Sequence, residues 1–189
     1  MNASAASQAW SEARTHFMSR AIQYYIAGRF AALTQQFPAC GNILHHAVEM
    51  AIKASLAIQL PRGDIAKFRH DLKKMWRAFK VHYPDARLTR LGTPIAHLHK
   101  FERLRYPDEV MVSGMHGTFA LERAHVMDIK SFEAHRPPHY DLVLEDVDEL
   151  FYLIFNVTRM NPNFYLGGLH PSAINVLNDK NLHPFPPAP

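Results

Sequence analysis

The stretch GNILHHAVEMAIKASL, residues 41–56, decides the fold because it carries a helical pattern with two chemically different faces. Apolar and small residues recur there at steps of three and four, which predicts one buried face on a helix that runs to about Gln59. They are Leu44, Ala47, Val48, Ala51, Ser55 and Ile58. The opposite side carries a polar stripe at helical spacing. Its members are His45, His46, Glu49 and Lys53.

Helical patterns also lie on both sides of this stretch. Before it, residues 4–37 predict one long helix, which ends before Pro38 because a residue that precedes proline is driven out of the helical region. Gly28 lies within the inward stripe of that helix and is expected to let a second helix approach closely. After it, residues 71–82 and 88–105 have helical spacing with apolar faces. Four helices with short connections predict an antiparallel four-helix bundle.

The spacing of apolar residues changes after residue 108. Alternating residues from Val110 to Leu121 predict a β-hairpin, and residues 140–144 offer a further strand. Residues 146–160 predict a fifth helix with acidic residues at its N-terminal end, and residues 171–178 predict a short one.

We therefore expect one mainly α domain over the whole chain. It would consist of a four-helix bundle over residues 1–108, a β-hairpin insertion over 109–144, C-terminal helices over 145–182 and a proline-rich tail over 183–189. One of the C-terminal helices is too apolar to stand free and is expected to pack on the bundle. The tail is interpreted as an unstructured end, with a polyproline ligand as the alternative.

The composition fits a protein with one hydrophobic core. The chain has 189 residues, of which 48% are hydrophobic and 20% charged. It has no apolar run near the roughly 20 residues of a membrane span, and its start has no signal-peptide pattern. The single cysteine, Cys40, excludes an intrachain disulfide and favours a reducing compartment. We expect a cytoplasmic protein with no cofactor and no membrane association.

The formal net charge of +4 hides an uneven distribution. Residues 62–105 carry 12 basic and four acidic side chains, whereas residues 106–189 carry five basic and 11 acidic ones. The two regions could pair within one molecule, pair between subunits, or leave a surface for phosphate groups. Pairing within the molecule is the plainer interpretation, and a nucleic-acid surface is the alternative.

Four stretches resemble a bacterial group of HEPN-domain proteins. They are YYIAGRFAAL (24–33), GNILHHAVEMAIKASL (41–56), HDLKKMWRAFK (70–80) and FERLRYPDE (101–109). The resemblance spans about residues 20–109 and implies an antiparallel four-helix bundle that usually dimerises. Many HEPN proteins are metal-independent RNases, in which an Arg and a His are separated by four to six residues near the fourth helix.

That RNase pair is missing from the expected place. No histidine follows Arg103 or Arg105 with four to six residues between them. Two other pairs have the spacing, Arg77 with His82 and Arg90 with His97. In either pair the arginine would stabilise charge on the phosphate, and the histidine would transfer protons. With 21 basic residues and 13 histidines, such pairs also arise by chance.

The polar stripe on residues 41–56 is the stronger candidate for a ligand site. His46, Glu49 and Lys53 could converge with residues of neighbouring elements and bind a phosphate or nucleotide through the basic members. The neighbouring candidates are Arg29, His70, Asp71, Glu102 and Arg105. The alternative interpretation is an internal network of ion pairs that fixes helix register, or a solvated helix face.

Metal binding and thiol chemistry have weaker support in the sequence. Several pairs could offer metal ligands, but the chain has no HExxH motif and no Cys/His ligand set. These pairs are His45 with Glu49, His97 with His99, and His135 with His139. Cys40 lies before a helix without an identifiable catalytic partner. We therefore predict neither a metal site nor a cysteine nucleophile.

Together these patterns favour a non-catalytic HEPN-like module that binds nucleic acid, a nucleotide or a protein partner. The resemblance implies a homodimer, and a defence or toxin–antitoxin setting. An RNase that uses a displaced Arg/His pair is the enzymatic alternative. A structural dimer without a ligand is the third interpretation.

Overall fold

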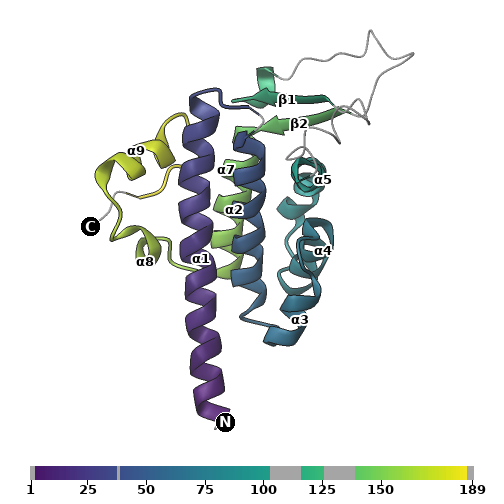
Figure 1. Cartoon of the computed structure of the whole chain (residues 1–189), viewed down its shortest axis with the longest axis vertical. Coiled ribbons are helices and arrows are strands. Elements are labelled where there is room, and N and C mark those ends of the chain that lie inside the picture. The colour runs from purple at the N-terminus through teal and green to yellow at the C-terminus, as the bar shows by residue number, and fades with distance from the viewer. Residues whose placement is uncertain (1–2, 38, 103–115, 126–138, 187–189) are drawn as a thin grey trace.

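A computed structural model describes residues 3–37, 39–102, 116–125 and 139–186 of the chain, which are mainly helical (Figure 1). The α-helices are α1 (Ala3–Leu33), α2 (Ala39–Leu56), α3 (Arg62–Lys67), α4 (Leu72–His82), α5 (Gly92–Phe101), α7 (Leu144–Thr158), α8 (Asn163–Leu166) and α9 (Pro171–Asn178). The described residues also form the 3-10 helices η1 (Ala86–Leu91) and η3 (Arg123–His125) and the strands β1 (His116–Ala120) and β2 (His139–Val143). The mainly α class agrees with the helical spacing of the sequence.

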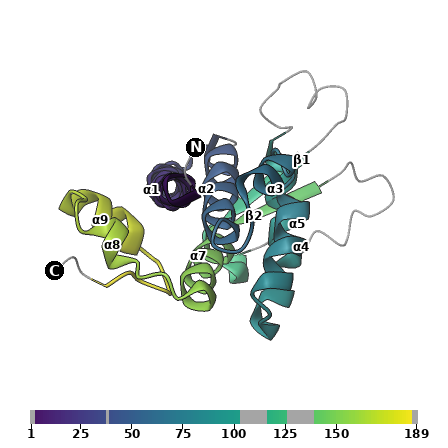
Figure 2. The ribbon, with the colours of Figure 1, turned by 90° about the horizontal axis from the view of Figure 1, so that it is seen from below.

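Helices α1 and α2 lie side by side and run in opposite directions (Figures 1 and 2). Gly28 lies where the two helices touch, and a Cβ atom there would be 2.6 Å from Leu44 Cδ2. Such a distance is far inside van der Waals contact, so a larger residue would push the helices apart. The predicted role of Gly28 in close helix approach is confirmed.

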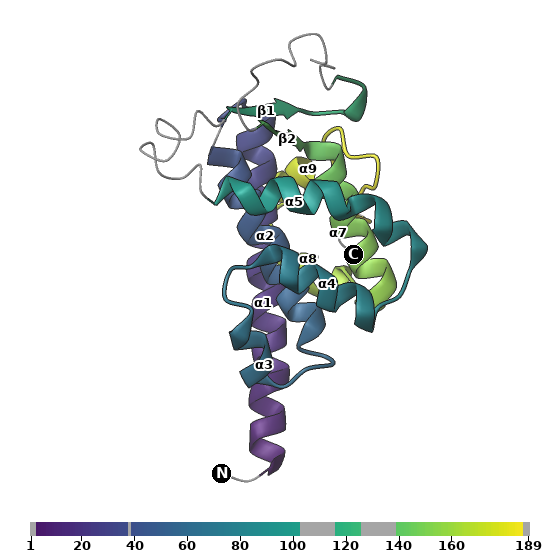
Figure 3. The ribbon, with the colours of Figure 1, turned by 90° about the vertical axis from the view of Figure 1, so that its right-hand side faces the viewer.

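Helices α4 and α5 form a second antiparallel pair, which crosses α1 and α2 steeply instead of lying along them (Figure 3). The predicted antiparallel four-helix bundle is therefore not confirmed. The helix expected over residues 88–105 is divided into η1 and α5 at Gly92. Pro94 lies in the first turn of α5 and lacks the amide hydrogen that a continuous helix would need there.

The strand pair is parallel, so the predicted β-hairpin is wrong for the described residues. Strand β1 pairs with β2 in a register that runs from His116 opposite His139 to Ala120 opposite Val143. Parallel strands need a crossover connection, whereas a hairpin joins antiparallel neighbours through a tight turn. The strand expected over 140–144 coincides with β2, and the partner expected near Val110 lies outside the described residues.

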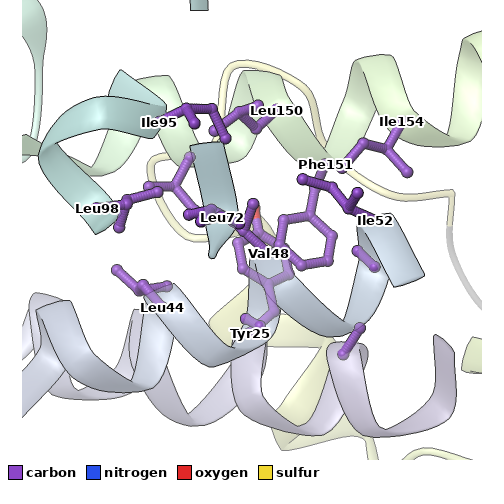
Figure 4. Close-up of a cluster of buried hydrophobic side chains, with 14 of the residues drawn as sticks. Tyr25, Leu44, Val48, Ile52, Leu72, Ile95, Leu98, Leu150, Phe151 and Ile154 are labelled. Carbon is purple, nitrogen blue, oxygen red and sulfur yellow. The ribbon is translucent and has the colours of Figure 1, made fainter. Parts of the chain in front are cut away.

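The hydrophobic core lies where α1, α2, α4, α5 and α7 meet (Figure 4). Tyr25 of α1 stacks on Phe151 of α7, with ring centroids 3.9 Å apart and planes 7° from parallel. The other labelled side chains around them are aliphatic and come from α2, α4, α5 and α7. Each fully buried aliphatic or aromatic side chain contributes roughly 1.5–3 kcal/mol to folding. The fifth predicted helix, now α7, thus packs on the others as expected.

The start of the proline-rich tail is part of this core, so its interpretation as an unstructured end is wrong for residues 183–186. The Phe185 side chain is buried. Its amide donates to Asn178 Oδ1 at 2.8 Å, and its carbonyl accepts from Asn178 Nδ2 at 3.2 Å. A buried aromatic ring with both backbone groups bonded to α9 explains why this short segment is ordered. Residues 187–189 lie outside the described part.

Within the described part of the chain, none of the helices has both the length and the apolar character needed to cross a membrane.

Candidate functional site

A buried carboxylate, Glu49, is the centre of the polar stripe on α2. Its side chain is 0% exposed and has cationic or imidazole groups on several sides. Lys53 Nζ donates to Oε1 at 2.6 Å. His70 Nδ1 lies 3.1 Å from Oε2, His45 Nε2 lies 3.5 Å from it, and His46 Nδ1 lies 3.8 Å from it. We call Glu49, Lys53, His45, His46 and His70 the Glu49 cluster.

The Glu49 cluster holds its central carboxyl group in the ionised form. Burial alone would raise the pKa of Glu49, but contacts with His45 and His46 and the ammonium group of Lys53 lower it well below its usual range. A charge that is out of water needs such partners, because an unpaired buried carboxylate is costly. The cluster therefore has an ionised carboxylate at its centre, surrounded by nitrogen atoms.

One side of the Glu49 cluster reaches solvent. His70 is 59% exposed and His46 is 27% exposed, whereas His45 is buried. Tyr24 and His70 both lie near the His46 ring, with ring centroids 5.9 and 6.4 Å from it. A small ion or polar ligand could therefore reach Glu49 from the His70 side.

The local backbone explains how His70 arrives at α2. The chain between α3 and α4 turns through Arg69, which has the left-handed backbone angle φ of 50°. His70 follows this turn, and the next residue is Asp71, whose carboxylate accepts the amide of Lys74 at 3.0 Å and caps α4. Asp71 thus starts the helix that positions His70, and its carboxylate is 3.3 Å from Lys74 Nζ.

Arg29 lies in a different network, although the sequence grouped it with the polar stripe. It is fully buried and forms an ion pair with Asp148 of α7. Arg29 Nε donates to the Val176 carbonyl at 2.9 Å, and Nη2 donates to the Asp179 carbonyl. Tyr25 donates to Asp148 Oδ1 at 2.6 Å, and burial followed by the charge of Asp148 raises the pKa of this phenol. Arg29 therefore fastens the C-terminal segment to α1 and α7.

Some of the other predicted ligand residues join the Glu49 cluster, and others do not. His46, Glu49, Lys53 and His70 are brought together. Glu102 approaches the cluster, with Oε2 3.9 Å from His45 Nε2. Arg105 lies outside the described residues.

The Arg90 and His97 pair has other partners in the structure. Arg90 forms an ion pair with Glu149 of α7. His97 Nδ1 lies 3.1 Å from the backbone nitrogen of Asp141 and 3.0 Å from its carbonyl oxygen, so this ring holds strand β2 against α5. Both side chains therefore connect elements of the fold.

The Arg77 and His82 pair lies on α4, with Arg77 exposed. His82 lines a polar hollow of about 510 Å³ together with Arg87, Asn156 and Arg159. Arg77 does not line this hollow, so the two members of the pair do not share it.

A basic stripe follows one side of α4, where Arg77 is exposed and Lys73 and Lys80 are half-buried. We define it as Lys73, Arg77 and Lys80, which follow one another at steps of four and three and therefore share one side of the helix. The nearby carboxylates are used elsewhere. Asp64 pairs with Lys67, Asp71 with Lys74, and Asp85 with Arg87. Among the described residues, the basic stripe has no ion-pair partner.

The acidic end of the chain pairs largely with cations of its own fold. Arg123 contacts Glu145 at 2.6 Å and both Asp146 and Glu149 at 2.5 Å. Arg90 contacts Glu149 as well. Pairing within the molecule thus uses Arg90 from the basic middle region but leaves the basic stripe of α4 uncompensated by described residues.

Two features of this site could not be found from the sequence. The contact of Asp148 with Tyr25 and Arg29 is not predictable, because Asp148 lies 123 positions from Tyr25 and gives no local signal. The basic stripe was recognised only as a regional excess of charge, since the sequence does not show which cations an acidic neighbour neutralises.

Comparisons with known proteins found no match to a family model, to a curated protein or to a solved structure.

Proposed function

We propose that this protein is a non-catalytic module that binds nucleic acid through the phosphate backbone. The observation that carries the proposal is the basic stripe of Lys73, Arg77 and Lys80 on α4, which lacks acidic partners among the described residues. Phosphate contacts by Lys and Arg supply most of the affinity of sequence-independent nucleic-acid binding.

The charge balance of this region supports the proposal. Residues 62–91 contain nine Lys and Arg against three Asp, and each of the three Asp already pairs with a cation outside the basic stripe. Like charges one turn apart on a helix destabilise it by about 0.2–0.5 kcal/mol per pair. A polyanion lying along α4 would remove this repulsion and would gain about 10 Å of continuous positive surface.

RNA is the first probe, because the HEPN resemblance implies RNA as the substrate class of many related proteins. The experiment titrates a labelled single-stranded RNA with the native protein and with the variant K73Q/R77Q. A matched control, R20Q/K180Q, removes the same charge from α1 and from the segment after α9. The proposal expects weaker binding for K73Q/R77Q and nearly native binding for the control. Equal loss in both variants would show attraction by net charge alone and would overturn it.

The same titration tests the enzymatic alternative. The RNA recovered after incubation is analysed for cleavage, together with H82A and H97A variants. We expect intact RNA with the native protein. Cleavage that is lost in either variant would replace our proposal by an RNase mechanism based on that histidine.

The HEPN assignment remains a prediction that rests on the quoted stretches, three of which fall wholly or mainly on α1, α2 and α4. The homodimer, the cytoplasmic location, and the defence or toxin–antitoxin setting remain predictions of sequence patterns and resemblance. Binding of a nucleotide or of a protein partner is a further prediction, for which the described residues offer no observation as specific as the basic stripe.

A further inference from the structure

The Glu49 cluster contains a buried imidazole nitrogen that needs a cation beside it. His45 Nδ1 lies 2.9 Å from the carbonyl oxygen of Leu98, a distance at which the nitrogen must donate its hydrogen. In the neutral ring, Nε2 then carries a lone pair and no hydrogen. Within the described part of the chain, this buried Nε2 has no hydrogen-bond partner.

What faces His45 Nε2 makes this arrangement unfavourable on its own. Two carboxylate oxygens lie near it, Glu49 Oε2 at 3.5 Å and Glu102 Oε2 at 3.9 Å. A lone pair that points at negative oxygens in a buried site is repulsive. The repulsion becomes attraction when a positive ion lies between them, either a proton on Nε2 or a metal ion bound to both groups.

The distances favour a metal ion. Zn²⁺ binds imidazole nitrogen and carboxylate oxygen at about 2.0–2.2 Å in tetrahedral geometry, so two of its ligand atoms lie about 3.4 Å apart. His45 Nε2 and His46 Nδ1 lie 3.5 and 3.8 Å from Glu49 Oε2. These two distances exceed the zinc value by only a few tenths of an ångström. One ligand atom from each of the three residues lies within 4.8 Å of the other two, so the side chains can converge on one ion.

The surroundings resemble the support that protein metal sites usually have. Histidine ligands commonly donate their other ring hydrogen to a backbone carbonyl, as His45 does to Leu98. The other oxygen of Glu49, Oε1, accepts from Lys53, which fixes the carboxylate with Oε2 toward the imidazole rings. His70 Nδ1 lies 3.1 Å from Oε2 on the solvent side, where it or a water molecule could complete four ligands.

We propose that His45 Nε2, His46 Nδ1 and Glu49 Oε2 form a binding site for a divalent transition-metal ion of the zinc type, with His70 at its open side. Two imidazoles and one carboxylate are a ligand set that Zn²⁺ prefers and that Mg²⁺ and Ca²⁺, which prefer oxygen ligands, do not. The site is independent of the basic stripe on α4, so failure of one proposal leaves the other standing.

The experiment measures binding of Zn²⁺ to the full chain after removal of any affinity tag and after treatment with a chelator. A competing chromophoric chelator reports stoichiometry and Kd, and Co²⁺ reports geometry through its visible absorption. We expect one ion per chain, a tetrahedral Co²⁺ spectrum, and a melting temperature raised by roughly 5–10 °C at a hundredfold excess of Zn²⁺ over Kd.

The variant H46A removes a ligand that is partly exposed, so the fold should tolerate it. We expect its affinity for Zn²⁺ to fall at least about 100-fold, because even supporting residues of metal sites change affinity by about 10–100-fold. The control H125A removes a histidine that is 68% exposed, beside Glu122 and outside the cluster, and should bind Zn²⁺ as the native chain does.

Three results would overturn the proposal. Native protein that binds no Zn²⁺ more tightly than H46A would assign the cluster to an internal network with a protonated His45. An octahedral Co²⁺ spectrum would exclude a tetrahedral site built from two imidazoles and one carboxylate. Equal losses in H46A and H125A would show scattered binding to surface histidines.

Discussion

Replacing Asp148 by asparagine tests whether the buried pair with Arg29 holds the C-terminal segment in place. The change preserves the shape of the side chain and removes the charge that faces a fully buried guanidinium group. Arg29 keeps the carbonyl oxygens of Val176 and Asp179 as acceptors but loses its counter-charge. Breaking a buried ion pair from one side costs about 3–5 kcal/mol.

That cost is a large part of the whole stability. The free energy of unfolding of a domain of this size is about 5–15 kcal/mol. Each kcal/mol of lost stability lowers the melting temperature by about 2–4 °C. We therefore expect D148N to lower the melting temperature by roughly 6–20 °C. Y25F removes one hydrogen bond to the carboxylate and should cost less, about 1.5–3 kcal/mol.

The assay is urea unfolding followed by circular dichroism and by tryptophan fluorescence, whose coincidence tests two-state behaviour. The double variant R29M/D148N leaves no unpaired charge at this position, so its loss of stability should be smaller than the sum of the two single losses by about 2 kcal/mol or more. A loss below about 1 kcal/mol in D148N, or strictly additive losses, would refute this account of the pair.

Two further predictions concern packing near the start of α2. G41A should destabilise the protein by about 1–3 kcal/mol in urea unfolding, because a Cβ atom there would overlap the Phe101 ring, whereas G63A, which meets no atom within 4 Å, should not. Equal stability of the two variants would contradict close packing at Gly41. The second prediction concerns the reactivity of Cys40. Burial raises the pKa of its thiol to about 11, so about one molecule in a thousand carries the thiolate at pH 8. A thiol-specific disulfide reagent should therefore react slowly with native protein and quickly in urea, and fast reaction without urea would contradict this.

The sequence predicts the helices well where the local pattern is strong. The expected helix over 71–82 agrees with α4 because Asp71 caps it and its inward residues repeat at helical spacing. The close approach at Gly28 was also predictable. The crossing of α4 over α2 and the parallel pairing of β1 with β2 were not, because both depend on contacts between segments distant in the chain.

The candidate site was likewise predictable where residues share one helix and not where their contacts depend on distant segments. Helical spacing alone grouped His46, Glu49 and Lys53, since these residues lie one turn apart on α2. Arg29 was grouped with them because an arginine near a polar stripe suggests a phosphate ligand, yet its direction depends on α7 and α9. Which lysines of α4 lack a partner could be learned only after Asp64, Asp71 and Asp85 had been paired in space.

The salt dependence of RNA binding is the most direct test of the proposed function. For single-stranded nucleic acid, the logarithm of the binding constant falls with the logarithm of salt concentration with a slope of about −0.7 for each phosphate contact. If Lys73 and Arg77 each contact a phosphate, K73Q/R77Q should have a slope shallower than the native one by about 1.4. R20Q/K180Q should keep the native slope. Equal slopes for native protein and K73Q/R77Q would contradict the proposal that α4 carries the nucleic-acid surface.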